Sequence, residues 1–178
     1  MKLKISKEEF YNTVYGILGD VTPLEVDCGQ LCNGACCEVT DEITGMYLFP
    51  GEEVMYKNMP DWAEIYETDF CYNGKHADLF TCTGSCEREK RPLSCRIFPL
   101  VPYVKKGERL EIRMDIRGRG MCPLATAMKP EDLDPKFVKN VTLAMKLCTA
   151  NPEVREFLYK LTESLDEAEG ILWATVLQ

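Results

Sequence analysis

The chain is poor in histidine, contains no long hydrophobic run and has fewer basic than acidic residues. Histidine occurs once, at position 76, in 178 residues. This scarcity excludes the imidazole-rich catalytic zinc sites and removes an obvious general base. No window approaches the ~20 apolar residues of a membrane-spanning helix, and the N-terminal residues do not resemble a secretion signal. We therefore expect a cytoplasmic protein with no membrane partner.

Acidic residues outnumber basic ones by 29 to 21, which gives a formal net charge of -8. An acidic surface repels phosphate, so nucleic acid is not an expected partner. A chain of this length buries roughly 70% of its unfolded surface and needs no covalent staple to fold. No repeat or linker interrupts it, and one domain is predicted over residues 1–178.

Helices are predicted at both ends of the chain. Ser6 and Glu9 have the spacing of a capping box, and apolar side chains follow at helical intervals. Near the other end, an Asn-Pro pair is a good helix start, because Asn caps and Pro fits the first turn. The predicted helices are 6–18, 134–149 and one that begins at Asn151-Pro152, the last two forming a C-terminal helical part, 134–178.

The middle of the chain is predicted to contain a β-hairpin around 97–117, where apolar and β-branched residues flank a polar turn at Gly107. A short strand that turns into a helix is predicted near 47–53. Residues 70–95 have little periodicity but four cysteines, so a loop held by something other than packing is predicted there. His76 lies in this loop and is expected to be solvated. The expected fold class is a small, irregular α+β domain.

Cysteine is the residue in excess, with ten in the chain. In a reducing compartment such a number indicates metal binding or redox chemistry rather than a disulfide framework. Only Cys148 lies in a plain amphipathic helix, where a core position is expected. The nine candidate metal ligands define a metal-binding core, 28–122: Cys28, Cys32, Cys36, Cys37, Cys71, Cys82, Cys86, Cys95 and Cys122.

Four of these thiols fall in the ten residues CGQLCNGACC, which begin at Cys28. Gly29 and Gly34 favour tight turns, in which backbone N–H groups can approach sulfur. Adjacent Cys36 and Cys37 are expected to point in different directions. They suit two neighbouring metal positions, or one metal and one packing role. Eight of the nine thiols would fill two four-ligand sites.

The choice between zinc and an iron–sulfur cluster stays open, because both take soft thiolate ligands. Cys32 and Cys36 have three intervening residues, so the C-x3-C-x2-C radical signature is absent, as are C-x-x-C-H and C-x-x-C. Two hypotheses follow: a zinc or iron site of structural or carrier role, and an iron–sulfur protein with redox or enzymatic activity.

A second segment, RPLSCRIFP, surrounds Cys95. Four thiolates on a divalent ion leave a net charge near -2, and nearby guanidinium groups can offset it through N–H···S contacts. The three arginines placed to do so are Arg88, Arg91 and Arg96.

The combination of CGQLCNGACC, two intermediate cysteines, RPLSCRIFP and a late cysteine resembles the YkgJ-type family of zinc- or iron-chelating cysteine-cluster proteins. A related domain occurs in flagellin lysine N-methylases. The match covers residues 28–122. It implies that Cys28, Cys32, Cys36, Cys37, Cys71, Cys82, Cys95 and Cys122 are ligands, whereas Cys86 has no firm counterpart. The analogy adds protein lysine methylation as a third hypothesis, although no glycine-rich loop for S-adenosylmethionine is present.

Overall fold

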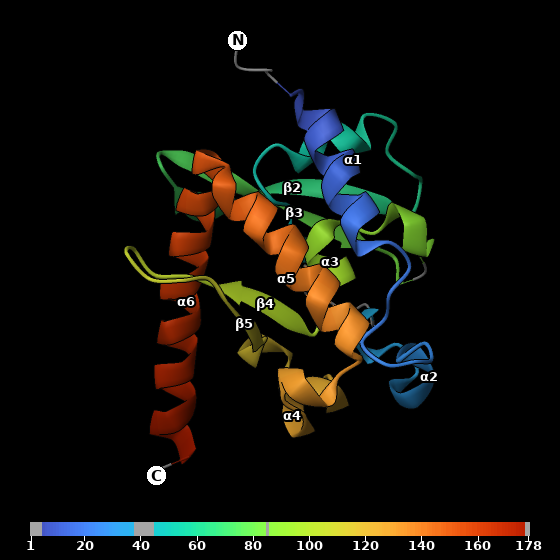
Figure 1. Ribbon diagram of the computed structural model, residues 1–178, viewed down its shortest axis with the longest axis vertical. Coiled ribbons are helices and arrows are strands. Elements are labelled where there is room, and N and C mark those ends of the chain that lie inside the picture. Colours follow the sequence, from blue (N-terminus) through green and yellow to red (C-terminus); the bar gives the residue numbers. More distant parts are fainter. Residues whose placement is uncertain (1–4, 38–44, 85, 177–178) are drawn as a thin grey trace.

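Helices pack around small antiparallel sheets in the computed structural model, which describes residues 5–37, 45–84 and 86–176. Figure 1 shows α1 lying beside α5, while α6 forms one side of the molecule and α2 and α4 lie at its lower end. The predicted mixed α+β class is confirmed. The remaining residues of the predicted domain, 1–4, 38–44, 85 and 177–178, lie outside the described ones.

The first helix begins at the predicted capping box. Helix α1 spans Lys7–Leu18, the Ser6 hydroxyl accepts a hydrogen bond from the Glu9 amide at 3.1 Å, and the Glu9 carboxylate accepts one from the Ser6 amide at 2.9 Å. This reciprocal pair satisfies amides that have no partner within the helix. The prediction for 6–18 is confirmed.

Two helices close the described chain, as predicted. Helix α5 spans Pro135–Ala150, and the Asp134 carboxylate accepts a hydrogen bond from the amide of Phe137. Helix α6 spans Pro152–Val176, and Asn151 caps its first turn. Each begins with a proline at a position where a missing amide hydrogen costs nothing. Cys148 is fully buried on α5, which confirms its core position.

A long hairpin occupies part of the segment that was predicted to be a loop. Strands β2 (Ala63–Tyr72) and β3 (Lys75–Cys82) pair antiparallel. Between them lie Asn73 and Gly74, both in the left-handed region at φ 47° and 73°. Such a pair makes a tight turn that matches strand twist. The loop prediction for 70–95 is therefore wrong up to residue 82, and His76 lies on a strand.

Shorter elements complete this layer. Strand β1 (Met46–Tyr47) pairs with β3, so the sheet order is β1-β3-β2. The chain then forms η2 (Glu52–Tyr56), a 3₁₀ helix where a helix start was predicted. A second sheet consists of β4 (Leu100–Tyr103) and β5 (Glu111–Met114), which confirms the predicted hairpin. Its turn contains Gly107 at φ 81°.

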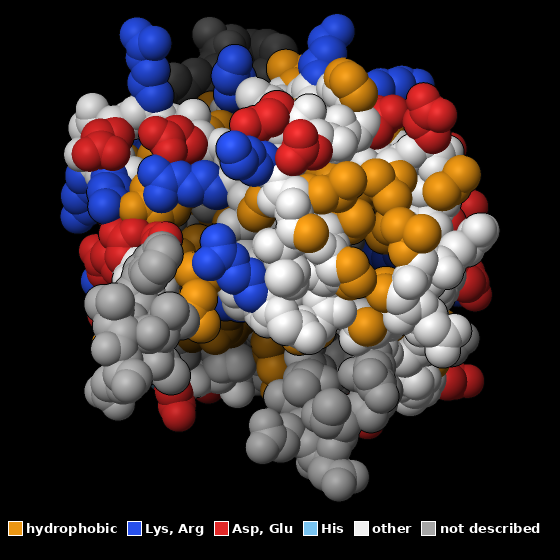
Figure 2. All heavy atoms as spheres, turned by 90° about the horizontal axis from the view of Figure 1, so that it is seen from below, with side chains coloured by type: hydrophobic (Ala, Val, Ile, Leu, Met, Phe, Trp, Pro, Cys, Tyr) orange, Lys and Arg blue, Asp and Glu red, His pale blue; other side chains and the backbone are white. Residues whose placement is uncertain are grey.

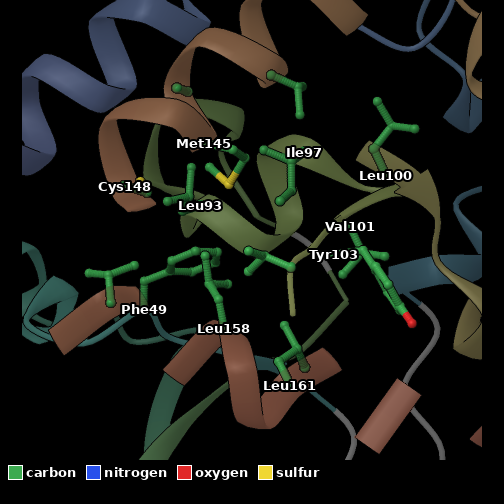
Figure 3. Close-up of a cluster of buried hydrophobic side chains, with 14 of the residues drawn as sticks. Phe49, Leu93, Ile97, Leu100, Val101, Tyr103, Met145, Cys148, Leu158 and Leu161 are labelled. Atoms are coloured by element: carbon green, nitrogen blue, oxygen red, sulfur yellow. The ribbon is translucent and has the colours of Figure 1, made fainter. Parts of the chain in front are cut away.

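The main core lies between α3 (Leu93–Ile97), β4, α5 and α6. Figure 3 shows side chains from these elements meeting in one cluster. Its labelled members include Leu93, Ile97, Leu100, Val101, Met145, Cys148, Leu158 and Leu161. The core therefore holds α3, and with it the RPLSCRIFP segment, against the long helices. Within the described ranges no helix is both long and apolar enough to cross a membrane.

Phe157 joins α6 to the three-stranded sheet. Its side chain is fully buried, and its ring centroid lies 5.4 to 6.4 Å from those of four aromatic neighbours. Three of the four contacts are edge-on, an arrangement favoured by the ring quadrupoles. The neighbours are Tyr47, Phe49, Phe70 and Tyr72.

Candidate metal centre

The segment that carries the first four cysteines is built from very short elements. Helix α2 spans Gly29–Cys32 and the 3₁₀ helix η1 spans Ala35–Cys37, and neither contains a buried residue. Asn33 and Gly34 between them have positive φ values of 52° and 69°. The tight turn predicted at Gly34 is therefore present, whereas Gly29 begins the short helix α2 instead of a turn.

Four cysteines line one small cavity. Cys28, Cys32 and Cys36 come from this segment, and Cys122 comes from the residue before α4 (Pro123–Ala127). The cavity has a volume of about 20 Å³. A space of this size holds about one water-sized occupant. We call these four residues the cavity group.

Apolar side chains surround the cavity group. They are Leu31, Phe98, Pro99, Pro123 and Leu124. Figure 2 views the end of the molecule where α2 and α4 lie, and hydrophobic side chains gather on part of this face. Leu31 and Met121 are exposed, with 62% and 50% of their surfaces accessible. The cavity group therefore lies close to solvent, behind a rim of exposed apolar side chains.

The thiols of the cavity group lie within reach of one another's charge. Burial raises the pKa of Cys28, and the charges of Asp27, Cys122 and Cys32 raise it further, whereas Arg88 lowers it. Ionising several of these thiols together is therefore unfavourable unless a cation accompanies the charge. A bound divalent ion is the usual way to supply that cation.

A second set of thiols lies around Cys95. Burial raises the pKa of Cys95, and the charges of Cys37, Cys86 and Cys82 raise it further. Cys37 belongs to η1, Cys82 ends β3, Cys86 precedes the 3₁₀ helix η3 (Arg88–Lys90), and Cys95 lies on α3. We call these four residues the arginine group, after Arg91. The positive charge of Arg91 lowers the pKa of Cys95, whereas the three neighbouring thiols raise it.

Arg91 contacts a sulfur directly. Its Nε donates a hydrogen bond to Cys86 Sγ at 3.2 Å, and a hydrogen bond to Cys37 is the largest cause that raises the pKa of Cys86. Such an N–H···S contact stabilises the thiolate and orients the ligand. The predicted charge-offsetting role thus has a direct contact at Arg91.

The other two predicted arginines act differently. Arg88 donates to the backbone carbonyl of Val21 at 2.7 Å. Arg96 donates from Nε to the Arg91 carbonyl at 2.7 Å, and its guanidinium stacks on the ring of Tyr15. Arg96 therefore holds the backbone at Arg91 in place. Among the described residues, it makes no hydrogen bond to a sulfur.

Cys36 and Cys37 form the junction between the two groups. Their sulfurs lie 4.0 Å apart, closer than the prediction of diverging side chains suggests. Sulfurs that share a tetrahedral zinc ion are about 3.8 Å apart for a Zn–S bond of about 2.3 Å. The distance alone therefore does not separate the two thiols, but their other neighbours do. The hydrogen bond to Cys37 lowers the pKa of Cys36, and the charges of the other thiols of the cavity group oppose this shift. Cys37 also forms a hydrogen bond with Cys86.

The closeness of the thiols does not by itself amount to metal coordination. In the parts of the chain that the structure covers, no three His, Cys, Asp or Glu side chains are arranged so that they could hold a metal ion. Eight of the nine predicted ligands are gathered into two neighbouring sets. Cys71 is exposed on β2 opposite His76, and the structure does not place it with either set.

Glu52 is a buried carboxylate that sequence reasoning missed. It is fully inaccessible and accepts hydrogen bonds from the Tyr15 hydroxyl at 2.5 Å, the Leu93 amide at 2.6 Å and the Phe49 amide at 2.9 Å. Burial raises its pKa to about 7, although these hydrogen bonds and the charge of Arg96 oppose the rise. Because Leu93 begins α3, Glu52 fixes the helix that carries Cys95.

No family model, curated protein or solved structure matches this chain. The resemblance to the YkgJ-type family therefore stays a prediction. What the thiols do has to follow from their own chemistry and arrangement.

Proposed function

We propose that this protein binds metal through the cavity group and the arginine group, one thiolate site each, with zinc as the preferred ion. One observation carries the proposal: cysteines from opposite ends of the predicted metal-binding core line a single cavity of about 20 Å³. Soft thiolates select zinc or iron–sulfur clusters. A cavity with room for about one water-sized occupant suits a single ion better than a cluster.

Each group has the four thiols of a closed zinc site. Structural zinc sites are almost always tetrahedral, and a set of four cysteines is one of their common forms. Cys86 supplies the fourth thiol of the arginine group, although the family pattern has no firm counterpart for it. Cys86 thus takes the place of Cys71 in the ligand set that the resemblance implies, and the resulting eight thiols form two sets of four.

Metal binding would also explain how the short cysteine-bearing elements are ordered. Helix α2 and η1 contain no buried residue that could anchor them. Zinc contributes on the order of 10–16 kcal/mol in small zinc modules, and that energy appears as folding energy. The proposed role is therefore structural for the segment around Cys28 to Cys37.

Anaerobic purification followed by elemental analysis and a visible spectrum tests the identity of the metal. We expect a colourless protein with about two zinc ions per chain. A brown protein with iron and sulfide, whose visible absorption bleaches on reduction, would replace zinc by the iron–sulfur alternative. A protein with no stoichiometric metal after reconstitution with zinc or iron would overturn the proposal.

Serine variants test the assignment to two groups. Cys28→Ser and Cys95→Ser should each remove about half of the metal, because each breaks one four-thiol set. The matched control is Cys71→Ser, which should keep the full content. Cys36→Ser and Cys37→Ser should weaken different sites, so their residual metal should be released by a chelator at different rates. Identical release from both variants would point to one shared centre.

A further inference from the structure

The hairpin of β2 and β3 places a thiol beside the only histidine of the chain. The tight turn pairs Cys71 with His76 in the strand register. Side chains of directly opposed residues lie on one face of an antiparallel pair. Cys71 Sγ lies 3.5 Å from Nδ1 and 3.8 Å from Nε2 of His76, within reach of a sulfur hydrogen bond.

A third group orients the histidine. The strand register shifts between Glu67 and Cys71, and within this irregularity His76 Nδ1 lies 2.7 Å from the backbone carbonyl oxygen of Thr68. A carbonyl oxygen has no proton to give, so Nδ1 is the donor. The neutral ring then has its lone pair on Nε2, the nitrogen able to accept a proton from the thiol.

Thr68 is itself held in position. Its hydroxyl donates to the Ala77 carbonyl at 2.8 Å, and its Oγ1 also accepts a hydrogen bond from the Phe70 amide at 3.3 Å. Strand irregularities often re-aim groups at functional sites. A nucleophile, a base within hydrogen-bond reach and a third group that orients the base together form the arrangement of an activated thiol.

Cys71 is one of two exposed cysteines among the described residues, and the other, Cys36, belongs to the cavity group. Both Cys71 and His76 are exposed, and Cys148 is buried in the core. The remaining cysteines belong to the cavity and arginine groups. In the metal-loaded protein, Cys71 is therefore the thiol left open to reagents in solution.

We propose that Cys71 is a reactive thiol that undergoes exchange with low-molecular-weight disulfides, and that His76 is its base. His76 Nε2 accepts the thiol proton, and Cys71 Sγ attacks one sulfur of the disulfide. A new S–S bond forms to Cys71 as the old one breaks. The released thiolate takes up the proton, so the disulfide is the oxidant and one free thiol leaves for each thiol modified.

The test uses 2,2′-dithiodipyridine, a neutral disulfide, on the full chain as purified with its metal. Release of thiopyridone gives the rate, and peptide mass mapping identifies the modified cysteine. We expect one fast-reacting thiol per chain, which is absent in Cys71→Ser. His76→Gln should slow it on the order of tenfold or more, since a positioned base supplies at least that much.

Lys75→Gln is the matched control. Lys75 neighbours His76 on β3 and forms an ion pair with Glu153, so this variant removes a nearby charge and leaves the thiol and its base intact. Its rate should stay within about twofold of the wild-type rate. A fast thiol that survives in Cys71→Ser, or a wild-type rate in His76→Gln, would overturn the proposal.

The proposal rests on the proposed function only for the number of protected thiols. If the chain held no metal, several cysteines would react in the wild type, yet mass mapping would still measure Cys71 by itself. Comparing the reaction rate of Cys71 in the wild type and in His76→Gln would then test the role of His76 in the same way. Failure of metal binding and failure of the Cys71–His76 pair therefore give different results.

Discussion

The helical core and the cysteine-bearing segment are stabilised in different ways. Helix α1 buries Tyr11, Val14 and Leu18, and α5 buries five side chains. Neither α2 nor η1 buries any. Burial of apolar surface contributes roughly 25 cal/mol per Å², so the helices have a driving force of their own. The cysteine-bearing segment lacks this force, and under the proposed function metal ligation would order it.

The contrast predicts that the core folds with or without metal, whereas residues 28–37 become ordered only with it. Hydrogen exchange can follow both in one sample. Removing metal with a chelator should abolish amide protection in 28–37 and leave α5 protected. Protection that persists in 28–37 after the metal is gone would break the comparison.

Phe157→Ala should have the largest effect on global stability. Phe157 is fully buried against four aromatic rings, and its removal leaves a cavity at the junction of α6 and β2. A loss of about 3–5 kcal/mol in the free energy of unfolding is expected. Urea titration of the metal-loaded protein measures it.

Leu31→Ala is the control within the cysteine-bearing segment, because 62% of the Leu31 surface is exposed. Its effect on the free energy of unfolding should stay within about 0.5 kcal/mol, as for most surface positions. Equal losses from Phe157→Ala and Leu31→Ala would show that the two regions unfold as one unit with similar packing.

The predictable parts of the fold are those set by local sequence. The Ser6–Glu9 capping box and the Asn151-Pro152 start each satisfy backbone groups within a few residues, so a linear pattern reveals them. The β2–β3 hairpin had a local signal too, the Asn73-Gly74 pair, which is the strongest short-range mark of a tight hairpin. It was missed because charged residues interrupt the alternation along both strands.

The grouping of the thiols could not be read from spacing. Cys122 reaches the cavity group only because the chain between Cys36 and Cys122 folds back through β3, α3 and β4. Glu52 shows the same limit. It lies in the segment near 47–53 where a strand turning into a helix was predicted, and contacts with Tyr15 and Leu93, both distant in sequence, bury it completely.

Glu52→Gln should change the pH dependence of stability. The native pKa of Glu52 is raised from 4.5 to about 7, chiefly by burial, so the native state binds this proton more tightly than the unfolded chain does. The contribution is therefore complete below about pH 4.5 and is lost as pH rises through about 7. It amounts to about 3 kcal/mol, at 1.36 kcal/mol per pKa unit.

Urea titrations of wild type and Glu52→Gln between pH 4.5 and 8, in the same metal state, measure this contribution. The advantage of the wild type should shrink as pH rises, because glutamine does not titrate. Glu53→Gln is the matched control, since the Glu53 carboxylate is exposed and pairs with Lys7 on the surface. Parallel pH profiles for wild type and Glu52→Gln would contradict the raised pKa.

Arg91→Gln should have a smaller effect, confined to one thiol group. The Arg91 Nε contact to Cys86 stabilises a thiolate of the arginine group, so its loss should weaken that site about tenfold. Arg88→Gln is the reciprocal variant, because the Arg88 charge lowers the pKa of Cys28 in the cavity group. Competition with a chelator that resolves two zinc affinities should show each variant shifting a different one. If both variants weaken both affinities equally, the two groups act as one centre, and the contrast lies between the core and a single thiol site.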